Sequence, residues 1–330
     1  MSNRLRFLLL FLLSITSVFF AEVLSGSTKY PLYDIWGILV VIPLYGLHTI
    51  LLLYIIYKFV GNQKILFSTM YFAGVLFGLY EAYLTKVLFV GLNEDSYIIL
   101  GVALLEFIVL VFFWHPLISF IIPVLVFEAF MTNESNIYEG LPGKVKMLLN
   151  KKVGRLLIFI ILGSYLALNA DSFIEAFFSG TLTVIPILIV YYVLRRKGVH
   201  TRYGLSEILP NNKQAKVLGL LLLAMYIILG IGINVEDLTF TGQFVIGVIY
   251  LIALYTFAKK LILNRLNNEI SFIGDVISFK YMIFYTMVMI FSGSAVALLW
   301  YAGLAGIFMV VYWLAWTATG LFLVIHFYKK

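Results

Sequence analysis

The chain has no cysteine and few charged residues. Of its 330 residues, 12% are Asp, Glu, Lys or Arg, whereas a soluble domain carries about 25%. The absence of cysteine excludes disulfides, thiolate catalysis and cysteine-based metal sites. The shortage of charge indicates that most of the chain has no surface facing water, and no polar stretch is long enough to bury a hydrophobic core of its own. A separate soluble domain is therefore excluded.

Several functional motifs are also missing. The sequence has no phosphate-binding glycine loop, no HExxH zinc helix and no GxSxG nucleophile elbow. No paired aspartate motif stands in an inner loop, which argues against Mg²⁺-dependent prenyl transfer, since that chemistry needs carboxylates to hold the metal. We therefore expect no metal and no cofactor.

What the sequence does contain is apolar. Hydrophobic residues make up 63% of the chain, and they recur in stretches near the roughly 20 residues that cross a bilayer core as a helix. The sequence predicts an all-α, polytopic transmembrane bundle of about ten spans. The predicted spans are 5–24, 35–57, 65–90, 97–131, 153–170, 173–194, 216–234, 238–258, 281–299 and 302–327.

The basic residues fix the expected orientation. With the amino terminus inside, all but two of the 23 lysines and arginines fall in cytoplasmic segments or at their edges. The two exceptions are Lys29, which lies outside, and Lys86, which lies within a span. Retention of Lys and Arg on the cytoplasmic side is the main determinant of topology. We predict a multi-pass protein of the cell membrane with both termini cytoplasmic. The net charge of +7 is explained by this topology and indicates no nucleic-acid partner.

Two segments allow more than one interpretation. Residues 5–20 resemble a signal peptide, but Phe20-Ala21-Glu22 lacks the small residues that a cleavage site requires, so we expect a retained first helix. The segment 97–131 would be about 52 Å long as a straight helix, and Pro116 lies within it. We expect one crossing, then a bend and a re-entrant or interfacial piece.

The chain is expected to form two parts. Residues 1–131 would be an N-terminal membrane bundle that holds the intramembrane charges, and residues 132–330 a C-terminal bundle of three helical hairpins. The hairpins begin near 153, 216 and 281. The first two both open with Lys-Val and close with paired basic residues, which suggests internal repeats.

Charge inside a span is costly and usually marks function, and the clear cases are Glu81, Lys86 and Glu106. Glu81 and Glu106 are each nine residues from the outer end of adjacent spans, hence roughly 13 Å deep. Two carboxylates at one depth could share a proton or a cation. Lys86 lies about one turn further out, where it could belong to the site, snorkel to the headgroups or form a buried ion pair with Glu81.

Other residues complete the candidate ion- or substrate-binding set. His48 lies within the second span, where it could face the same interior or bridge helices. His115 lies beside Pro116. Glu22 lies at the outer mouth, where it could gate an opening or cap a helix. A small-xxx-small row in span three allows close helix packing; it consists of Gly74, Gly78 and Ala82.

Two resemblances follow from these residues. Glu22 to Thr28, Gly78-Leu-Tyr-Glu81 with Lys86, and His115 followed by Pro123 resemble the pattern of an uncharacterised family of prokaryotic polytopic membrane proteins, over about the first 130 residues. That resemblance implies no known activity. Glu81 also resembles the glutamates of CAAX-type intramembrane proteases, although Tyr80 stands where that family has the first glutamate of its pair.

The leading functional hypothesis is a transporter or permease with an ion- or proton-coupled carboxylate site. One alternative is a membrane-embedded enzyme that acts on lipid or peptide at the same carboxylates. Another is a non-catalytic subunit of a membrane complex. The expected partners are membrane lipids, a small ion or small molecule, and other membrane proteins. A transporter predicts a water-filled path between halves, and an enzyme predicts a closed cavity with a lateral opening to lipid. A subunit predicts neither, with Glu81 and Lys86 paired in packed helices.

Overall fold

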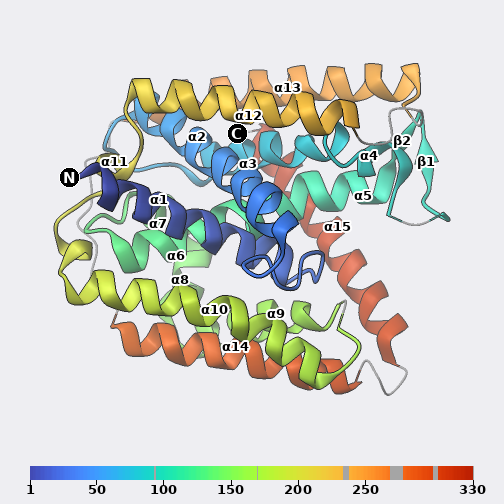
Figure 1. The fold of residues 1–330 in the computed structure, drawn as a ribbon. Helices are drawn as coiled ribbons and strands as arrows, with labels where there is room; N and C mark the ends of the chain where they lie inside the picture. The colour runs from blue at the N-terminus through green and yellow to red at the C-terminus, as the bar shows by residue number, and fades with distance from the viewer. Residues whose placement is uncertain (93, 169, 233–237, 268–277, 300–303, 330) are drawn as a thin grey trace.

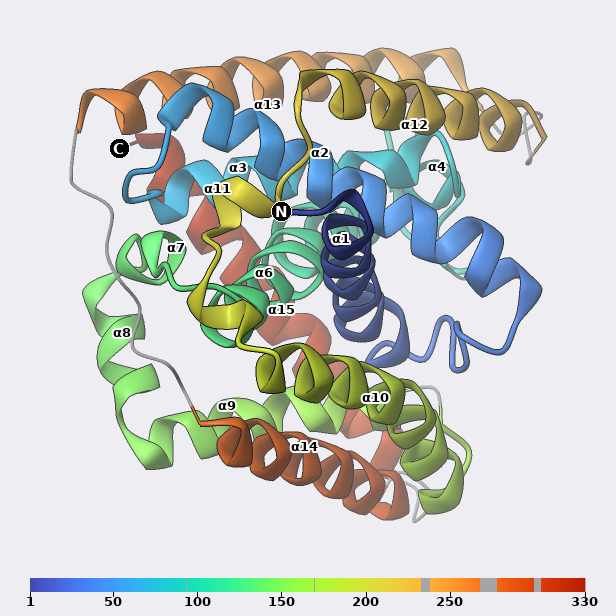
Figure 2. The ribbon, with the colours of Figure 1, turned by 60° about the vertical axis from the view of Figure 1, so that its left-hand side comes forward.

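The computed structural model describes residues 1–92, 94–168, 170–232, 238–267, 278–299 and 304–329. The helices lie in three layers (Figure 1). The helices α12 and α13 form one outer layer, α9, α10 and α14 form the other, and most of the first 131 residues lie between them. Turned by 60°, Figure 2 shows the same layers, with α15 behind the middle one.

The described elements of the first part are helical apart from one short hairpin. In chain order they are α1 (Asn3–Val18), η1 (Phe19–Val23), η2 (Gly37–Val41), α2 (Ile42–Val60), α3 (Phe67–Gly78), η3 (Leu79–Ala82), α4 (Val87–Val90), β1 (Ile98–Ile99), β2 (Val102–Ala103), α5 (Leu104–Val109), η4 (Leu110–Ile121) and α6 (Ile122–Met131). The strands β1 and β2 pair antiparallel, with Ile98 opposite Ala103.

The second part continues with longer helices. Its described elements are α7 (Asn136–Glu139), α8 (Gly143–Asn150), α9 (Lys152–Ser164), η5 (Tyr165–Ala167), α10 (Phe173–Arg196), η6 (Val199–Thr201), α11 (Leu205–Ile208), α12 (Asn212–Gly232), α13 (Phe240–Leu266), α14 (Phe279–Leu299) and α15 (Ala305–Lys329). The three predicted hairpins would pair α9 with α10, α12 with α13, and α14 with α15, and they stay a prediction; α14 packs against α9 and α10. The boundary between two parts at residue 131 stays a prediction.

Eight helices within the described residues are long and apolar enough to cross a membrane. The sequence predicted about ten spans. The difference lies at 65–90 and 153–170, where the structure has shorter helices. In the first segment α3 ends at Gly78, and Lys86 adopts a left-handed conformation with φ of 62° before α4. In the second segment α9 ends at Ser164. The length of an apolar stretch predicts a span, but it does not show where a helix ends within that stretch.

The segment 97–131 also differs from the prediction. The hairpin of β1 and β2 occupies its start, and a single helical segment of 28 residues runs from Leu104 to Met131. No re-entrant piece follows within this described stretch. Pro116, which has no N–H to donate, lies in η4, where the helix is π-helical. The wider turn accommodates the proline without ending the helix, and such turns are frequent at functional sites.

Successive helices alternate between two ends of the bundle. At one end the start of α1 meets the start of α12 through Arg6 and Gln214, and the end of α10 meets the end of α6 through Arg195 and the Phe130 carbonyl. We call this the basic end; it includes the loops 61–66, 132–142 and 197–211. The other end holds residues 24–36, 83–92 and 94–103 and the start of α10. We call it the Glu22 end.

Two candidate spans of the middle layer are the most buried. The span that contains α1 and the span from Leu104 to Met131 are each 67% buried, whereas that of α12 is 6% buried. Leu9, Leu12 and Leu13 are fully buried, and so are Leu53 of α2 and Phe77 of α3. Apolar side chains on the outside of α12 and α15 remain exposed, as expected of helices that face lipid. The middle layer is therefore the core that positions the buried polar residues.

Candidate functional site

Close packing between α3 and η4 sets the geometry of the site. A Cβ added to Gly74 would lie 2.4 Å from the Cα of Pro116, and one added to Gly78 would lie 3.0 Å from the Cα of Val111. Only glycine permits this approach of two backbones. The contact brings the residues just after α3 beside His115 of η4.

Glu81 and His115 form a buried pair. Their Oε1 and Nε2 atoms are 3.2 Å apart, and the His115 side chain is 1% exposed. The other carboxylate oxygen of Glu81 accepts a short hydrogen bond from Thr85. The Nδ1 atom of His115 lies 3.0 Å from the carbonyl oxygen of Leu110. Both ring nitrogens of His115 therefore have partners, and the ring is held in one orientation.

These contacts indicate where a proton can lie in the pair. A backbone carbonyl only accepts, so Nδ1 carries a hydrogen. A carboxylate also only accepts, so the contact with Glu81 needs a hydrogen on Nε2 or on the carboxyl group. With that hydrogen in place, the pair holds one proton more than a neutral imidazole beside a carboxylate, so the geometry suits a shared proton.

A chain of hydroxyl groups leads from this pair to a second carboxylate. The His115 Nε2 atom lies 3.3 Å from the Tyr80 hydroxyl, which lies 2.8 Å from the Tyr45 hydroxyl. The Tyr45 hydroxyl donates to Glu22 across 2.5 Å, and Thr28 donates to the other Glu22 oxygen across 2.7 Å. Since the Tyr45 hydrogen goes to Glu22, Tyr45 accepts from Tyr80, which can then accept from His115.

All of these groups line one cavity of about 760 Å³. It lies at the Glu22 end, where its rim includes the exposed residues Ser27, Trp36 and Leu92. Ligand-binding cavities typically measure about 300–1,000 Å³. The two carboxylates and the histidine therefore face a space large enough for a small molecule.

His48 lies beside the site without lining the cavity. Its Nδ1 lies 2.8 Å from the carbonyl oxygen of Leu44, and its Nε2 lies 2.9 Å from the hydroxyl of Tyr226 on α12. Its ring is 5.4 Å from that of Tyr80. The structure thus places His48 as a bridge between α2 and α12 that supports one wall of the site.

Lys86 and Glu106 lie apart from the Glu81–His115 pair. The Lys86 ammonium group donates to the carbonyl oxygens of Tyr83 and Gly230, at 2.8 and 2.7 Å. It therefore binds helix ends, and its described partners do not include Glu81. The Glu106 carboxylate accepts from Ser96 across 2.5 Å and does not line the cavity.

The sequence singles out Glu22, Glu81 and His115 but does not show their connection. It does not point to Tyr45 and Tyr80, because the chain has 22 tyrosines and no local pattern distinguishes these two. The described residues include no cluster of three or more His, Asp or Glu that could hold a metal ion.

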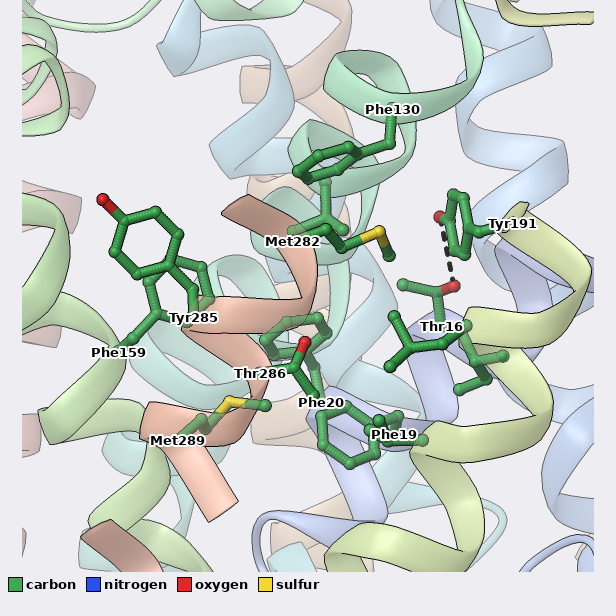
Figure 3. A pocket seen from close by; sticks show the side chains of 14 residues that line it. Thr16, Phe19, Phe20, Phe130, Phe159, Tyr191, Met282, Tyr285, Thr286 and Met289 are labelled. Carbon is green, nitrogen blue, oxygen red and sulfur yellow. Dashed lines mark hydrogen bonds between the residues drawn. The ribbon is translucent and has the colours of Figure 1, made fainter. Parts of the chain in front are cut away.

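A second, smaller pocket of about 50 Å³ lies between α1, α6, α9, α10 and α14 (Figure 3). Its lining is mostly Phe, Met and aliphatic side chains, and its described lining residues carry no charge. On one side of it the hydroxyl oxygens of Thr16 and Tyr191 lie 3.4 Å apart. This pocket has none of the titratable groups of the large cavity.

Two more buried carboxylates lie near the basic end and hold loops. Glu128 accepts hydrogen bonds from the backbone N–H groups of Ile137 and Tyr138, both at 2.9 Å. Glu134 accepts from the backbone N–H of Leu205 across 3.1 Å. Burial raises the pKa of the Glu134 carboxyl above its ordinary value. Each carboxylate ties backbone groups together, which is a structural role.

The long apolar helices define the class as a polytopic α-helical membrane protein. Residues 11–329 match a family described as an uncharacterized membrane protein family, and the chain belongs to it. An uncharacterized protein of Archaeoglobus fulgidus is 31% identical over 240 residues, which cover 71% of this chain and 72% of that protein. No solved structure matches.

The family match extends the resemblance that was expected for the first 130 residues to almost the whole chain. The similarity to CAAX-type proteases that Glu81 suggested finds no support in these matches.

Proposed function

We propose that the protein is a proton-coupled transporter of a small ion or small molecule, with Glu81, His115 and Glu22 as its proton-exchanging groups. The observation that carries the proposal is the continuous hydrogen-bonded chain between two carboxylates along one cavity. Buried ionisable groups in membrane segments commonly form proton relays. The broken helix after α3 also supports it, since discontinuous helices often build transport sites.

This chain of hydrogen bonds permits a proton to move without any large motion of the protein. The hydrogen on His115 Nε2 transfers to the Tyr80 oxygen while the Tyr80 hydrogen passes to Tyr45 and the Tyr45 hydrogen passes to Glu22. The result is a neutral His115 and a protonated Glu22, with both tyrosines restored. Glu22 lies beside the rim of the cavity, where this proton can be released.

We infer that the basic end faces the cytoplasm. Among the residues that the structure describes, the lysines and arginines other than Lys29 and Lys86 belong to segments at or next to that end, and such residues are retained inside. Both termini would then be cytoplasmic, in the cell membrane, and the cavity would open outward. The shorter units α3 with η3 and α9 with η5 would complete ten passes.

A membrane-embedded enzyme is the second candidate. The favouring observation is the Glu81–His115 pair in a cavity, because a histidine oriented by a carboxylate is a common general acid or base. A non-catalytic subunit is less well supported, since packed helices without a function would not need this cavity.

Cysteine labelling distinguishes transport from catalysis, because the natural chain has no cysteine. Leu110→Cys places one thiol on the cavity wall, and Asp95→Cys places one on an exposed loop at the Glu22 end as a control. A transporter exposes the cavity to each side in turn. We expect an impermeant thiol reagent to label Leu110→Cys from both faces of sealed vesicles, and Asp95→Cys from one face.

Labelling of Leu110→Cys from the outer face alone, under all conditions of pH and membrane potential, would contradict alternating access and favour the enzyme.

A further inference from the structure

Aromatic side chains form much of the cavity wall. Trp114, Trp313 and Trp316 line it together with Tyr45 and Tyr80. Trp114 and Trp316 are 5.3 Å apart between ring centroids, and Trp313 and Trp316 are 6.2 Å apart. These contacts make one continuous aromatic surface. Aromatic faces attract cations because the ring quadrupole is negative on its face.

The charged residues that line the cavity also favour a cation. Its lining includes the carboxylates of Glu22 and Glu81, whereas no lysine or arginine is among the described lining residues. Nearby basic groups are engaged elsewhere. Lys86 binds backbone carbonyls, and Lys29 pairs with Glu175 at 2.7 Å. An anion would thus meet two carboxylates without a compensating lysine or arginine.

We propose that the transported substrate is an organic cation with an apolar body. This inference rests on the proposed function and names the substrate class of the same site. The aromatic wall would cover the apolar body, and Glu81 would pair with the positive charge. The volume of about 760 Å³ lies within the range that encloses small organic ligands.

The hydrogen-bonded chain then explains how the cation exchanges for a proton. A cation that pairs with Glu81 replaces the positive charge of His115, so the His115 proton is no longer stabilised. That proton passes through Tyr80 and Tyr45 to Glu22 and leaves at the rim. One positive charge arrives and one leaves, so the net charge of the cavity is unchanged. Cation and proton therefore compete for the site, as an exchanger requires.

The test uses two probes of equal shape and opposite charge. Tetraphenylphosphonium is a cation with four phenyl groups, and tetraphenylborate is its anionic counterpart. Binding of each radiolabelled probe is measured to the full chain in lipid nanodiscs, with empty nanodiscs as the blank. We expect saturable binding of the phosphonium alone, weaker at low pH, with one proton released per cation bound.

Variants locate the binding. Glu81→Gln should weaken phosphonium binding more than about tenfold, the effect of losing one buried charge partner. Glu106→Gln, a buried carboxylate outside the cavity, should leave it unchanged. Trp313→Leu gives an independent measure if Glu81→Gln does not fold, and it should also weaken binding.

Saturable binding of the borate, or equal phosphonium binding by wild type and Glu81→Gln, would overturn the substrate class. If no phosphonium binds while Leu110→Cys is labelled from both faces, the cation inference fails and the transporter stands. If phosphonium binds but labelling occurs from one face only, the cation site stands and the transport proposal fails.

Discussion

Replacing Gly74 by alanine tests the packing that builds the site. The new methyl carbon would lie 2.4 Å from the Cα of Pro116, whereas carbon atoms in contact prefer about 3.5–4.0 Å. The helix α3 and η4 must therefore separate by about 1 Å. Overpacking of this kind costs about 1–3 kcal/mol, and the better helix propensity of alanine returns up to about 1 kcal/mol.

The same displacement acts on the proton site. Glu81 Oε1 and His115 Nε2 are 3.2 Å apart, so a further separation of about 1 Å would break their hydrogen bond. Gly74→Ala should lower the free energy of unfolding and should also change the titration of the His115 ring, measured by NMR of histidine-labelled protein. Gly219→Ala on α12 is the matched control, because a Cβ there has no neighbour within 4 Å.

Thermal unfolding of Gly74→Ala and Gly219→Ala, measured in one and the same detergent, gives the stability of both variants. We expect Gly219→Ala to be neutral or stabilising by up to about 1 kcal/mol. If Gly74→Ala were as stable as Gly219→Ala and the His115 signal unchanged, the account of close packing between α3 and η4 would be wrong.

Further predictions concern single side chains and the topology. Glu81→Gln should unfold within about 1 kcal/mol of wild type, since hydrogen bonds between membrane helices average about 0.6 kcal/mol, while proton exchange is lost; strong destabilisation would instead favour a structural role. Lys86→Met should lose about 1.5–3 kcal/mol of stability in thermal unfolding, and adding Glu81→Gln should not restore it, because the two side chains are not paired. The raised pKa of Glu134 means that the folded state binds its proton more tightly than the unfolded state. This contribution to stability is therefore present at low pH and is lost as the pH rises through the raised pKa. The free energy of unfolding of Glu134→Gln, measured across pH, should lack that fall, and pH profiles identical to those of wild type would refute the prediction. Gly143→Cys, at an exposed position where a Cβ has no neighbour within 4 Å, should resist impermeant reagents in intact cells while Asp95→Cys is labelled; the reverse pattern would contradict the predicted topology.

The sequence predicted the class of fold because apolar length is a local property. It could not predict the interruptions at Lys86 and after Ser164, because an apolar run continues through both. Glu106 was placed near Glu81 by counting residues along straight helices. The hairpin of β1 and β2 removes several residues from the assumed helix, and the Glu106 carboxylate binds Ser96 instead.

The candidate site was predictable only in part. Glu81 stood out because a charge in an apolar segment is rare. Its partner His115 is 34 positions later in the chain, and the contact depends on the approach of Gly74 and Gly78 to η4. Tyr80 could be recognised only once the fold placed its hydroxyl between His115 and Tyr45.

The central claim is that Glu22 and His115 are linked through the hydroxyl of Tyr80. It is tested most directly by the NMR titration of the His115 ring, with and without Glu22→Gln, in three backgrounds: wild type, Tyr80→Phe, and Tyr71→Phe as a control whose hydroxyl bonds to a backbone carbonyl elsewhere. We predict that Glu22→Gln shifts the titration in the wild-type and Tyr71→Phe backgrounds and that most of the shift disappears in Tyr80→Phe. An equal shift in all three backgrounds, or none in wild type, would contradict the proton chain.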